Sequence, residues 1–419
     1  KTIATIGTGS FANWSKLTKL TISGNTLTSI GSKAFENAAL LADVYAEPTT
    51  APAVQADSFS GAGTSVQGSK TFHVASVEAY SSWTTAASGY TMEALGPDYL
   101  SEGLYYRASG EDPWKSEIPQ TFTTLYVKTA GDNTVMTAEQ MKAVADAVKA
   151  LAAPATVDFS EVVYESETFP NSFKSNANLA GIVFPQNVTK TASAAFQKTG
   201  MTSVTLLKGI SYGSNAFDSC ASLVSVTVEE GVTEIGNYMF QNTKLTDVTL
   251  PNSVTKIGAS AFNGCSLTTI NFGQGVKTIE NSAFQNCGEL TEIILPDATE
   301  TLGQNAFGDC PKLAKISLGK NMKTLEAYCF VGYSKGCPLL GDIICRATTP
   351  PTLKDDYGTG PFGGGWSPVA GKDVPAENRI IHLPKSADPV GGTGAYADSS
   401  WVKLTSSTYG FAFKYDVEG

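Results

Sequence analysis

Cysteine is the residue type in this chain most suited to chemistry, as a nucleophile, a metal ligand or half of a disulfide. All seven cysteines fall between Cys220 and Cys345. Four of them stand three residues after a phenylalanine: Cys220, Cys265, Cys287 and Cys310. Thr199 and Thr243 take the same place after other phenylalanines. A catalytic thiol occurs once, with a base beside it, so a recurring place that accepts threonine predicts a ladder of buried structural side chains.

The odd number of cysteines argues against a complete disulfide framework. Cys329 and Cys337 flank an irregular stretch, FVGYSKGC, and Cys337 is the first candidate for a bridge, with Cys310 or Cys345 as its partner. Stacked repeats bring successive cysteines close together, but flush stacking gives poor disulfide geometry. This pair therefore stays an open alternative to free thiols.

Other reactive groups are sparse. His73 and His382 are the only histidines, and they occupy equivalent places in two similar segments, which predicts a packing or hydrogen-bonding role. No third histidine is available to build a zinc cluster. Neighbouring carboxylates in SGEDPW and LKDDY lack the spacing of a calcium-binding loop. No pair of carboxylates stands out as a candidate for glycoside hydrolysis. The glycine-rich stretches GTGSF and FGGGW lack the strand, helix and lysine that accompany a phosphate-binding loop. The sequence predicts no enzyme, no cofactor and no metal site.

The content of charged residues limits the kinds of binding partner that the protein can have. Charged residues make up 16% of the 419 residues and the net charge is -10, without a block of Lys or Arg. Nucleic acid is therefore an unlikely partner, because phosphate binding needs a clustered positive patch. No run of 18 apolar residues occurs in the sequence, so no segment is expected to span a membrane.

An internal repeat positions the residues named above. Its most regular mark is a phenylalanine every 21 to 23 residues: Phe196, Phe217, Phe240, Phe262, Phe284, Phe307 and Phe330. A leucine follows most of them and begins an alternation such as LVSVTV, LTDVTL or LTTINF, which is typical of a short strand. A period of 20–29 residues with one strand per repeat is typical of a leucine-rich-repeat solenoid.

Stacking explains the pattern, because one repeat cannot bury its Leu, Ile and Phe alone. We predict an α/β solenoid, a right-handed leucine-rich-repeat superhelix with one parallel β-sheet of short strands. A glycine often follows the Ile or Leu before the turn, as Gly258 does, and permits a positive φ or a close backbone passage. The segment xxAFxxC is predicted to form one short helical turn that carries Phe inward.

The repeat resembles the BspA-like leucine-rich repeat family. The stretch LTDVTLPNSVTKIGASAFNGC, Leu245–Cys265, matches the family phrase LTxIxLPxSVTxIGxxAFxxC almost throughout, and residues 1–46 and 155–345 carry repeats in the same phase. The resemblance implies a secreted or surface-displayed bacterial protein with a role in adhesion, since these repeats occur mostly on surface proteins of anaerobic gut and oral bacteria.

Each array of repeats is followed by a similar non-repeat segment, since YAEPTTAPAV parallels CRATTPPTL and TFHVASVEAYSSW parallels IIHLPKSADPVGGTGAYADSSW. We interpret both as C-terminal caps over an open solenoid end. Lys1 falls inside a repeat, so we expect either that the first array has lost its beginning or that the sequence starts midway through it. The expected division is a partial array with its cap in 1–95, a connecting segment with an N-terminal capping helix in 96–154, the main array in 155–345, and the second cap in 346–419.

The capping helix is expected from Ala138 to Ala152. Thr137 and Gln140 have the spacing of a capping box. Four apolar residues fall on one face of this helix: Met141, Val144, Val148 and Leu151. This face is expected to cover the strand ATVDFS, the first of the main array.

The candidate binding face consists of strand positions whose side chains point away from the core: Ser203, Thr205, Ser225, Thr227, Asp247, Thr249, Thr269, Asn271, Glu292, Ile294, Lys315 and Ser317. Solenoids commonly bind partners through such an extended face, although it could equally be the solvated side of a sheet. Ile294 and Ile344 are its apolar exceptions. Aromatic residues of the caps are a second candidate surface, with cap packing as the alternative: Tyr80, Trp83, Trp366, Tyr396 and Trp401.

We expect a monomeric extracellular or cell-surface protein that recognises a host or bacterial macromolecule, with an extracellular protein or glycan as its partner. A glycan-binding accessory protein of a polysaccharide-uptake system is an alternative, which exposed aromatic platforms would favour. A passive stalk is another, which a distal domain in a longer chain would favour.

Overall fold

The computed structural model describes residues 3–418 except for 23–25, 47, 49, 76, 87–88, 95–102, 113, 131–133, 333, 356–359, 364–369, 376–377, 388–394, 397–398 and 407–408. The chain groups into two compact units, Lys1–Pro119 with Val127–Val135, and Gln120–Tyr126 with Met136–Gly419. The four-part division expected from the sequence stays a prediction, and its boundary between 95 and 96 lies outside the described residues.

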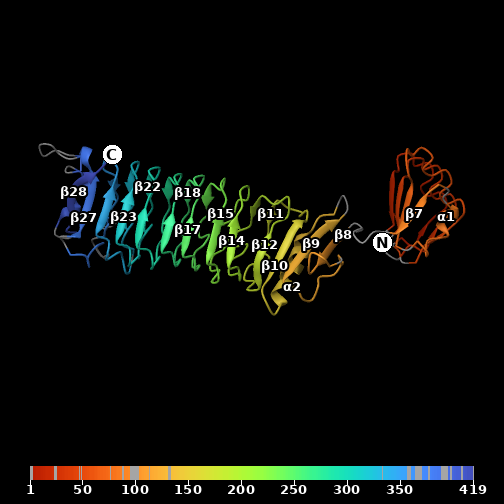
Figure 1. Ribbon diagram of the computed structural model, residues 1–419, viewed down its shortest axis with the longest axis horizontal. Helices are drawn as coiled ribbons and strands as arrows, with labels where there is room; N and C mark the ends of the chain where they lie inside the picture. Colours follow the sequence, from red (N-terminus) through yellow and green to blue (C-terminus); the bar gives the residue numbers. More distant parts are fainter. Residues whose placement is uncertain are drawn as a thin grey trace. The chain divides into compact units, whose positions relative to one another are not determined.

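The second unit is a solenoid with one main strand in each turn (Figure 1). Its main strands occur where the repeat predicts them: β10 (Ala155–Glu161), β12 (Leu179–Val183), β14 (Ser203–Leu206), β15 (Ser225–Val228), β17 (Asp247–Thr249), β19 (Thr269–Asn271), β21 (Glu292–Ile294), β23 (Lys315–Leu318) and β25 (Asp342–Cys345). Paired strands are parallel and aligned position by position, as in Val248↔Ile270 and Ile316↔Ile343. Because the side chains alternate between faces, the apolar positions of successive turns form one continuous core.

A second strand of two residues occurs in most turns, where the sequence analysis expected one strand per repeat. These strands are β11 (Thr168–Phe169), β13 (Lys190–Thr191), β16 (Glu234–Ile235), β18 (Lys256–Ile257), β20 (Thr278–Ile279), β22 (Thr301–Leu302), β24 (Thr324–Leu325) and β26 (Thr352–Leu353). The last six form one parallel sheet. The short strands therefore hydrogen-bond most turns to a neighbour on a second side, because the repeated Ile or Leu turns inward and leaves its backbone in register.

The repeated phenylalanines form a stack along the core. Phe262 and Phe284 have ring centroids 5.2 Å apart with planes 7° from parallel, and Phe284 and Phe307 are 5.2 Å apart at 5°. The stack follows from the repeat itself, since each ring occupies the same place in its turn. The small Ala before each Phe, such as Ala283, is also buried.

The segment around each Phe is not the short helical turn expected from the sequence. It consists of two successive turns, with left-handed residues such as Ser260 (φ 54°) and Gly264 (φ 73°) on either side of Phe262. The N–H groups of these two residues and of Phe262 donate to carbonyls of the next turn at 2.8–2.9 Å, instead of to carbonyls four residues back. Hydrogen bonds between turns therefore outweigh the helical alternative.

Gly258 does not have a positive φ, so the prediction that glycine is needed here for a left-handed conformation is wrong. The prediction that glycine allows the backbones of two turns to pass closely is confirmed. A Cβ atom on Gly258 would lie 2.8 Å from the backbone nitrogen of Asn237 and 2.9 Å from the carbonyl carbon of Gly236 in the preceding turn. Side chains cannot occupy that space without moving the backbone of the neighbouring turn.

The first unit has the same construction. Its short strands are β1 (Thr5–Ile6), β3 (Ser29–Ile30) and β5 (Ala53–Val54), and its main strands are β2 (Lys19–Ile22), β4 (Asp43–Ala46), β6 (Thr71–Val74) and β7 (Thr91–Ala94). Helix α1 (Trp83–Ala86) precedes β7. Each set forms one parallel sheet.

The non-repeat segments of the two units are built alike. The hydroxyl of Tyr80 donates to the Pro48 carbonyl at 2.8 Å, and that of Tyr396 to the Ala347 carbonyl at 2.7 Å. The indoles of two equivalent tryptophans donate to proline carbonyls: Trp83 to Pro52 at 3.0 Å and Trp401 to Pro351 at 2.8 Å. All four aromatic side chains are buried, so they pack the ends of the solenoid instead of forming a binding surface. Trp366 lies outside the described residues.

Two strands of these segments were missed. β7 follows α1 in the first unit, and β28 (Ala412–Val417) follows the 3-10 helices η2 (Lys385–Ala387) and η3 (Ser400–Thr405) in the second. β28 extends the parallel sheet β21-β23-β25-β27, in which β27 is Ile380–Pro384. The alternation in FAFKYDV is the sequence signal that would have indicated it.

Helix α2 runs over Ala138–Ala150, two residues shorter than expected, because Leu151 leaves the helical region as its C-cap. The capping box of Thr137 and Gln140 is confirmed. Met141, Val144 and Val148 are buried, whereas Leu151 is half-buried.

The segment around α2 contributes two further strands. These are β8 (Gly103–Arg107) and β9 (Thr124–Ala130). β9 lies beside β10 in the same sheet, and the side chain of Asn176 donates to the Ala145 carbonyl of α2 at 2.9 Å. The helix is thereby fixed to the first turn of the solenoid.

Candidate functional site

The main strands present the candidate binding face, and we call the exposed residues on the four strands β14, β15, β17 and β19 the outer face. These residues are Ser203, Thr205, Ser225, Thr227, Asp247, Thr249, Thr269 and Asn271. Their register is aligned, with Ser203 opposite Ser225, Thr205 opposite Thr227, and Asp247 opposite Thr269. The outer face is therefore rich in hydroxyl groups and carries one carboxylate.

Two of the twelve predicted positions are not exposed. Ser317 is only 8% exposed, because it lies in register between the larger Ile294 and Ile344 on neighbouring strands. Lys315 is half-buried between two carboxylates. Ile294 is 59% exposed as expected, whereas Ile344 is half-buried, contrary to expectation. Exposure here depends on the sizes of neighbours in register, which one repeat does not reveal.

Charges of alternating sign cross the strands that follow the outer face. The Nζ atom of Lys315 lies 3.3 Å from a Glu292 oxygen and 3.9 Å from an Asp342 oxygen. His382 continues the row, with Nε2 3.4 Å from Asp342 and Nδ1 2.8 Å from Asp416. Lys315 thus has a carboxylate on each neighbouring strand, and so does the His382 ring, which stabilises these cross-strand pairs modestly.

An equivalent row occurs in the first unit. His73 lies 3.2 Å from Asp43 through Nε2 and 3.8 Å from Glu93 through Nδ1, and it stacks on Tyr45 with ring centroids 4.3 Å apart. The Nζ atom of Lys19 lies 4.4 Å above the Tyr45 ring. The hydrogen-bonding role predicted for both histidines is confirmed. His73 links its strand β6 to Asp43 on β4, and His382 links its strand β27 to Asp416 on β28.

The cysteines form the predicted buried ladder, and all seven are free thiols. The bridge from Cys337 to Cys310 or Cys345 is not formed. Cys337 instead donates its thiol proton to the Phe307 carbonyl at 3.2 Å, and Cys265 donates likewise to the Phe240 carbonyl at 3.1 Å. These thiols satisfy carbonyls of the phenylalanine turns, a role for which threonine also suffices.

Burial makes the thiols of Cys265 and Cys287 inert as nucleophiles at neutral pH. Desolvation raises the pKa of Cys265 to about 11, although its hydrogen bond with Thr243 opposes the shift. Desolvation also raises the pKa of Cys287 well above its usual value, and the neighbouring Cys310 and Cys265 add to this. A thiol that stays protonated cannot attack a substrate.

The raised pKa of Cys265 predicts a loss of stability in alkali. In the unfolded chain this thiol ionises near pH 8.5, but in the folded protein it stays neutral up to about pH 11. Its contribution to stability is therefore complete below about pH 8.5 and declines as the pH approaches 11, by about 1.4 kcal/mol per pH unit.

Replacement by threonine tests this assignment. Cys265→Thr keeps a donor of the kind that Thr243 provides in the preceding turn, and should flatten the decline measured by urea unfolding between about pH 8.5 and pH 10.5. Unfolding free energies that fall equally in both proteins would contradict the assignment. Cys265→Val is the control, since it should also flatten the decline while removing the thiol that donates to the Phe240 carbonyl, which keeps the Thr243 hydroxyl as a donor.

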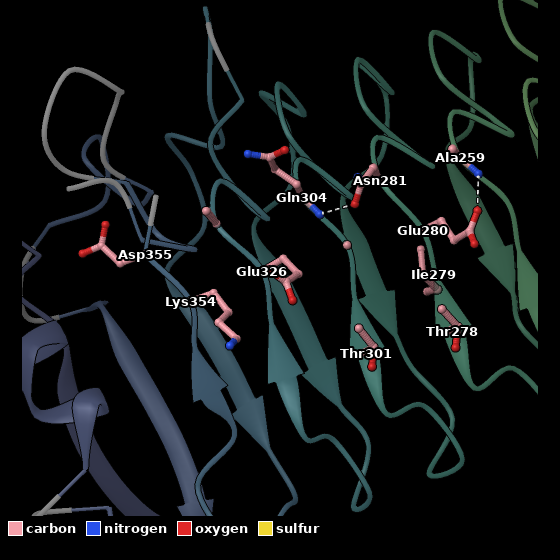
Figure 2. A pocket seen from close by; sticks show the side chains of 12 residues that line it. Ala259, Thr278, Ile279, Glu280, Asn281, Thr301, Gln304, Glu326, Lys354 and Asp355 are labelled. Carbon is pink, nitrogen blue, oxygen red and sulfur yellow. Dashed lines mark hydrogen bonds between the residues drawn. The ribbon is translucent and has the colours of Figure 1, made fainter. Parts of the chain in front are cut away.

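A shallow groove crosses the side of the solenoid that carries the short strands (Figure 2). Its volume is about 690 Å³. Glu280 and Glu326 stand where other turns have glycine, and Gly303 between them leaves the space open. This groove was not predicted from the sequence, although the exchange of glycine for glutamate is visible there.

Two polar side chains of the groove, Glu280 and Asn281, are bonded to neighbouring turns. The Glu280 carboxylate lies 2.9 Å from Lys256 Nζ and accepts the Ala259 N–H at 3.1 Å. This carboxylate raises the pKa of Lys256 above its usual value through a hydrogen bond and charge attraction. The Asn281 side chain accepts the Gln304 N–H at 2.9 Å. These groups fix the turns to one another and do not converge on a reacting atom.

Among the described residues, no group of three or more His, Cys, Asp or Glu side chains is placed to hold a metal ion. None of the helices in the described part of the chain is long and apolar enough to cross a membrane.

The family model described as "BspA type Leucine rich repeat region" matches six copies in this chain, over residues 1–66, 157–212 and 210–336. These matches cover more than half of the chain. No curated protein matches the sequence.

Solved structures of leucine-rich repeat proteins show a distant likeness. A leucine-rich cell-surface protein from Faecalibacterium prausnitzii A2-165 is 20% identical, with 82% of this chain and 83% of that chain covered and a TM-score of 0.34. A leucine-rich repeat protein from Eubacterium ventriosum ATCC 27560 is 17% identical, with 80% and 84% covered and a TM-score of 0.32. Whole-chain superposition is poor at these TM-scores, so neither structure bears on function.

Proposed function

Because the chain belongs to the BspA-type leucine-rich repeat family, we propose that it is a non-enzymatic recognition protein of the bacterial surface or exterior. Its outer face binds a protein or glycan of host or bacterial origin. Leucine-rich repeat proteins are generally binding proteins, and an extended sheet face of a solenoid suits contact with a large partner.

The exposed, aligned outer face is the observation that carries this proposal. Its side chains are short, and within each hydrogen-bonded strand pair they are fixed in rows by the register. Short hydroxyl and amide groups lose little side-chain entropy on binding and can hydrogen-bond to many partners. The ionic row on the later strands is already paired within the protein, so it has less to offer a partner.

An enzymatic role lacks support from the thiol of Cys265 and the groove carboxylate of Glu280. The buried thiol of Cys265 stays protonated at neutral pH, and the groove carboxylate of Glu280 is held by Lys256 and a backbone N–H. A general acid or base needs a free path to its substrate. These side chains stabilise the repeat stack instead.

Glycan binding through aromatic platforms loses its main support, since Tyr80, Trp83, Tyr396 and Trp401 are buried. A glycan could still bind the hydroxyl groups and amide of the outer face through hydrogen bonds. For this reason the partner panel must contain both proteins and glycans.

The binding test uses a double variant with a matched control. Thr227→Arg with Thr249→Arg places two bulky cations on the outer face and should weaken binding to any member of a glycan and extracellular-matrix protein panel by about tenfold or more. Thr233→Arg with Thr255→Arg makes the same exchanges at exposed threonines of the same turns, away from the main strands, and should leave binding unchanged.

Two outcomes would count against the outer face. If no panel member binds the unaltered protein, the adhesion proposal for these residues fails and the stalk alternative gains. If both double variants weaken binding equally, the partner contacts another surface or responds to net charge alone. Melting temperatures of the variants check that the substitutions leave the fold intact.

A further inference from the structure

Strands β12 and β14 follow each other in the solenoid but are not joined. β12 pairs with β10, and β14 pairs with β15. In this part of the chain, where every residue is described, no backbone hydrogen bond links the two strands. Nearly all Cα–Cα distances between them exceed 8 Å, whereas paired strands lie about 4.8 Å apart. Two strand edges therefore face each other across a gap.

The opposite side of the same turns stays closed. Phe196 stacks on Phe217 with ring centroids 5.3 Å apart, and the Phe196 N–H donates to the Ala216 carbonyl at 2.9 Å. The Lys198 N–H donates to the Asp218 carbonyl at 2.9 Å. The turns are thus held together at the phenylalanine stack and splayed at their main strands.

A cleft of about 410 Å³ opens between the splayed strands, within the size range of ligand sites. Its larger apolar lining residues are Ile182, Val183, Phe184, Met201, Val204, Leu207 and Phe217. Three hydroxyls, of Thr156, Ser203 and Thr205, supply the polar side-chain groups, and none of the lining residues is charged. Gly181 has no side chain to fill the space.

We propose that this cleft binds an extended peptide segment of a partner protein, which adds as a strand between β12 and β14. An inserted strand needs its two neighbours about 10 Å apart, twice the usual strand spacing. Backbone N–H and C=O groups on a strand edge pair readily with an added chain. The uncharged lining selects segments with apolar and hydroxyl side chains, because charged groups would be desolvated without a partner.

A peptide suits the cleft better than an acyl chain of equal volume. An acyl chain would contact the apolar lining but could not pair with the backbone of either strand. A peptide can contact the lining and also pair with both strand edges, apart from the end of the β14 edge, where the Tyr212 hydroxyl already accepts the Leu207 N–H at 3.1 Å. This inference rests on the proposed recognition role in naming a protein partner, but it concerns a separate place, which shares only Ser203 and Thr205 with the outer face.

The test measures binding of a labelled peptide with the sequence of residues 223–230, LVSVTVEE, to the whole chain by fluorescence anisotropy. This peptide carries the chain's own strand pattern and two glutamates for solubility. Saturable binding is expected. Methylation of alternate backbone nitrogens should weaken it by about tenfold or more, since those donors can no longer pair.

A matched pair of variants locates the site. Val183→Lys places a charge at the cleft, where the valine is 42% exposed, and should weaken peptide binding by about tenfold. Val224→Lys makes the same exchange at a valine that is 49% exposed and does not line the cleft, and should leave binding unchanged. Thr227→Arg with Thr249→Arg should also leave it unchanged, so the two proposals can fail separately.

Three results would overturn the inference. The first is the absence of saturable peptide binding. The second is equal affinity for the methylated and unmethylated peptides, which would exclude strand pairing. The third is equal loss in Val183→Lys and Val224→Lys, which would place binding elsewhere. Dodecanoate is tested beside the peptide as a probe for binding of an acyl chain. If dodecanoate binds and the peptide does not, the peptide proposal fails and the cleft is a site for apolar chains.

Discussion

Phe284→Ala should lower the free energy of unfolding of the second unit by about 3–5 kcal/mol. The ring is fully buried and stacks on Phe262 and Phe307 at 5.2 Å on either side, with the edge of Phe272 5.6 Å away. Truncation removes its contacts with three rings and leaves a cavity that turns fixed by hydrogen bonds on two sides cannot close. Urea unfolding followed by circular dichroism measures the loss.

Two comparisons isolate the stack. Phe284→Leu keeps most of the volume and should cost clearly less than the alanine exchange. Hydrogen exchange should show the loss concentrated in the turns of Phe262 and Phe307, because solenoid turns are stabilised mainly by their nearest neighbours. A loss below about 1 kcal/mol for the alanine variant would mean that the stack contributes little beyond filling space.

The repeat was readable because it places chemically similar residues at a fixed period. Leu245, Ile257 and Phe262 each point to the core in a way that alternation and spacing predict, and the main strands follow from them. Local conformation was less readable. Left-handed φ values at Ser260 and Tyr238 are imposed by hydrogen bonds to the next turn, and neither residue type signals such a conformation.

The candidate sites were readable only in part. The outer face follows from strand alternation, so most of its positions were predicted. Burial of Ser317 depends on Ile294 and Ile344, which come from other turns and meet it only in the folded register. The cleft between β12 and β14 depends on the spacing of whole turns, and no single residue encodes it.

Asp309→Ala should destabilise the irregular stretch that follows Phe330 and lower the free energy of unfolding by about 3 kcal/mol. Asp309 is 4% exposed. One of its oxygens accepts the backbone N–H groups of Ser334, Lys335 and Gly336 at 3.0, 2.6 and 2.9 Å. Alanine would leave these donors without their acceptor. Urea unfolding gives the total loss, and trypsin cleavage after the exposed Lys335 reports the local change.

The choice of controls separates the buried carboxylate from an ordinary acidic residue. Asp309→Asn keeps an oxygen acceptor but loses the charge, and should fall between wild type and alanine, because charge-assisted hydrogen bonds are about twice as strong as neutral ones. Glu289→Ala removes an exposed carboxylate paired with Lys312 and should change stability by less than about 1 kcal/mol. If Asp309→Ala matches Glu289→Ala and trypsin cleaves both variants at the wild-type rate, then the stretch is held by its apolar contacts and by Cys337, and the carboxylate does not organise it.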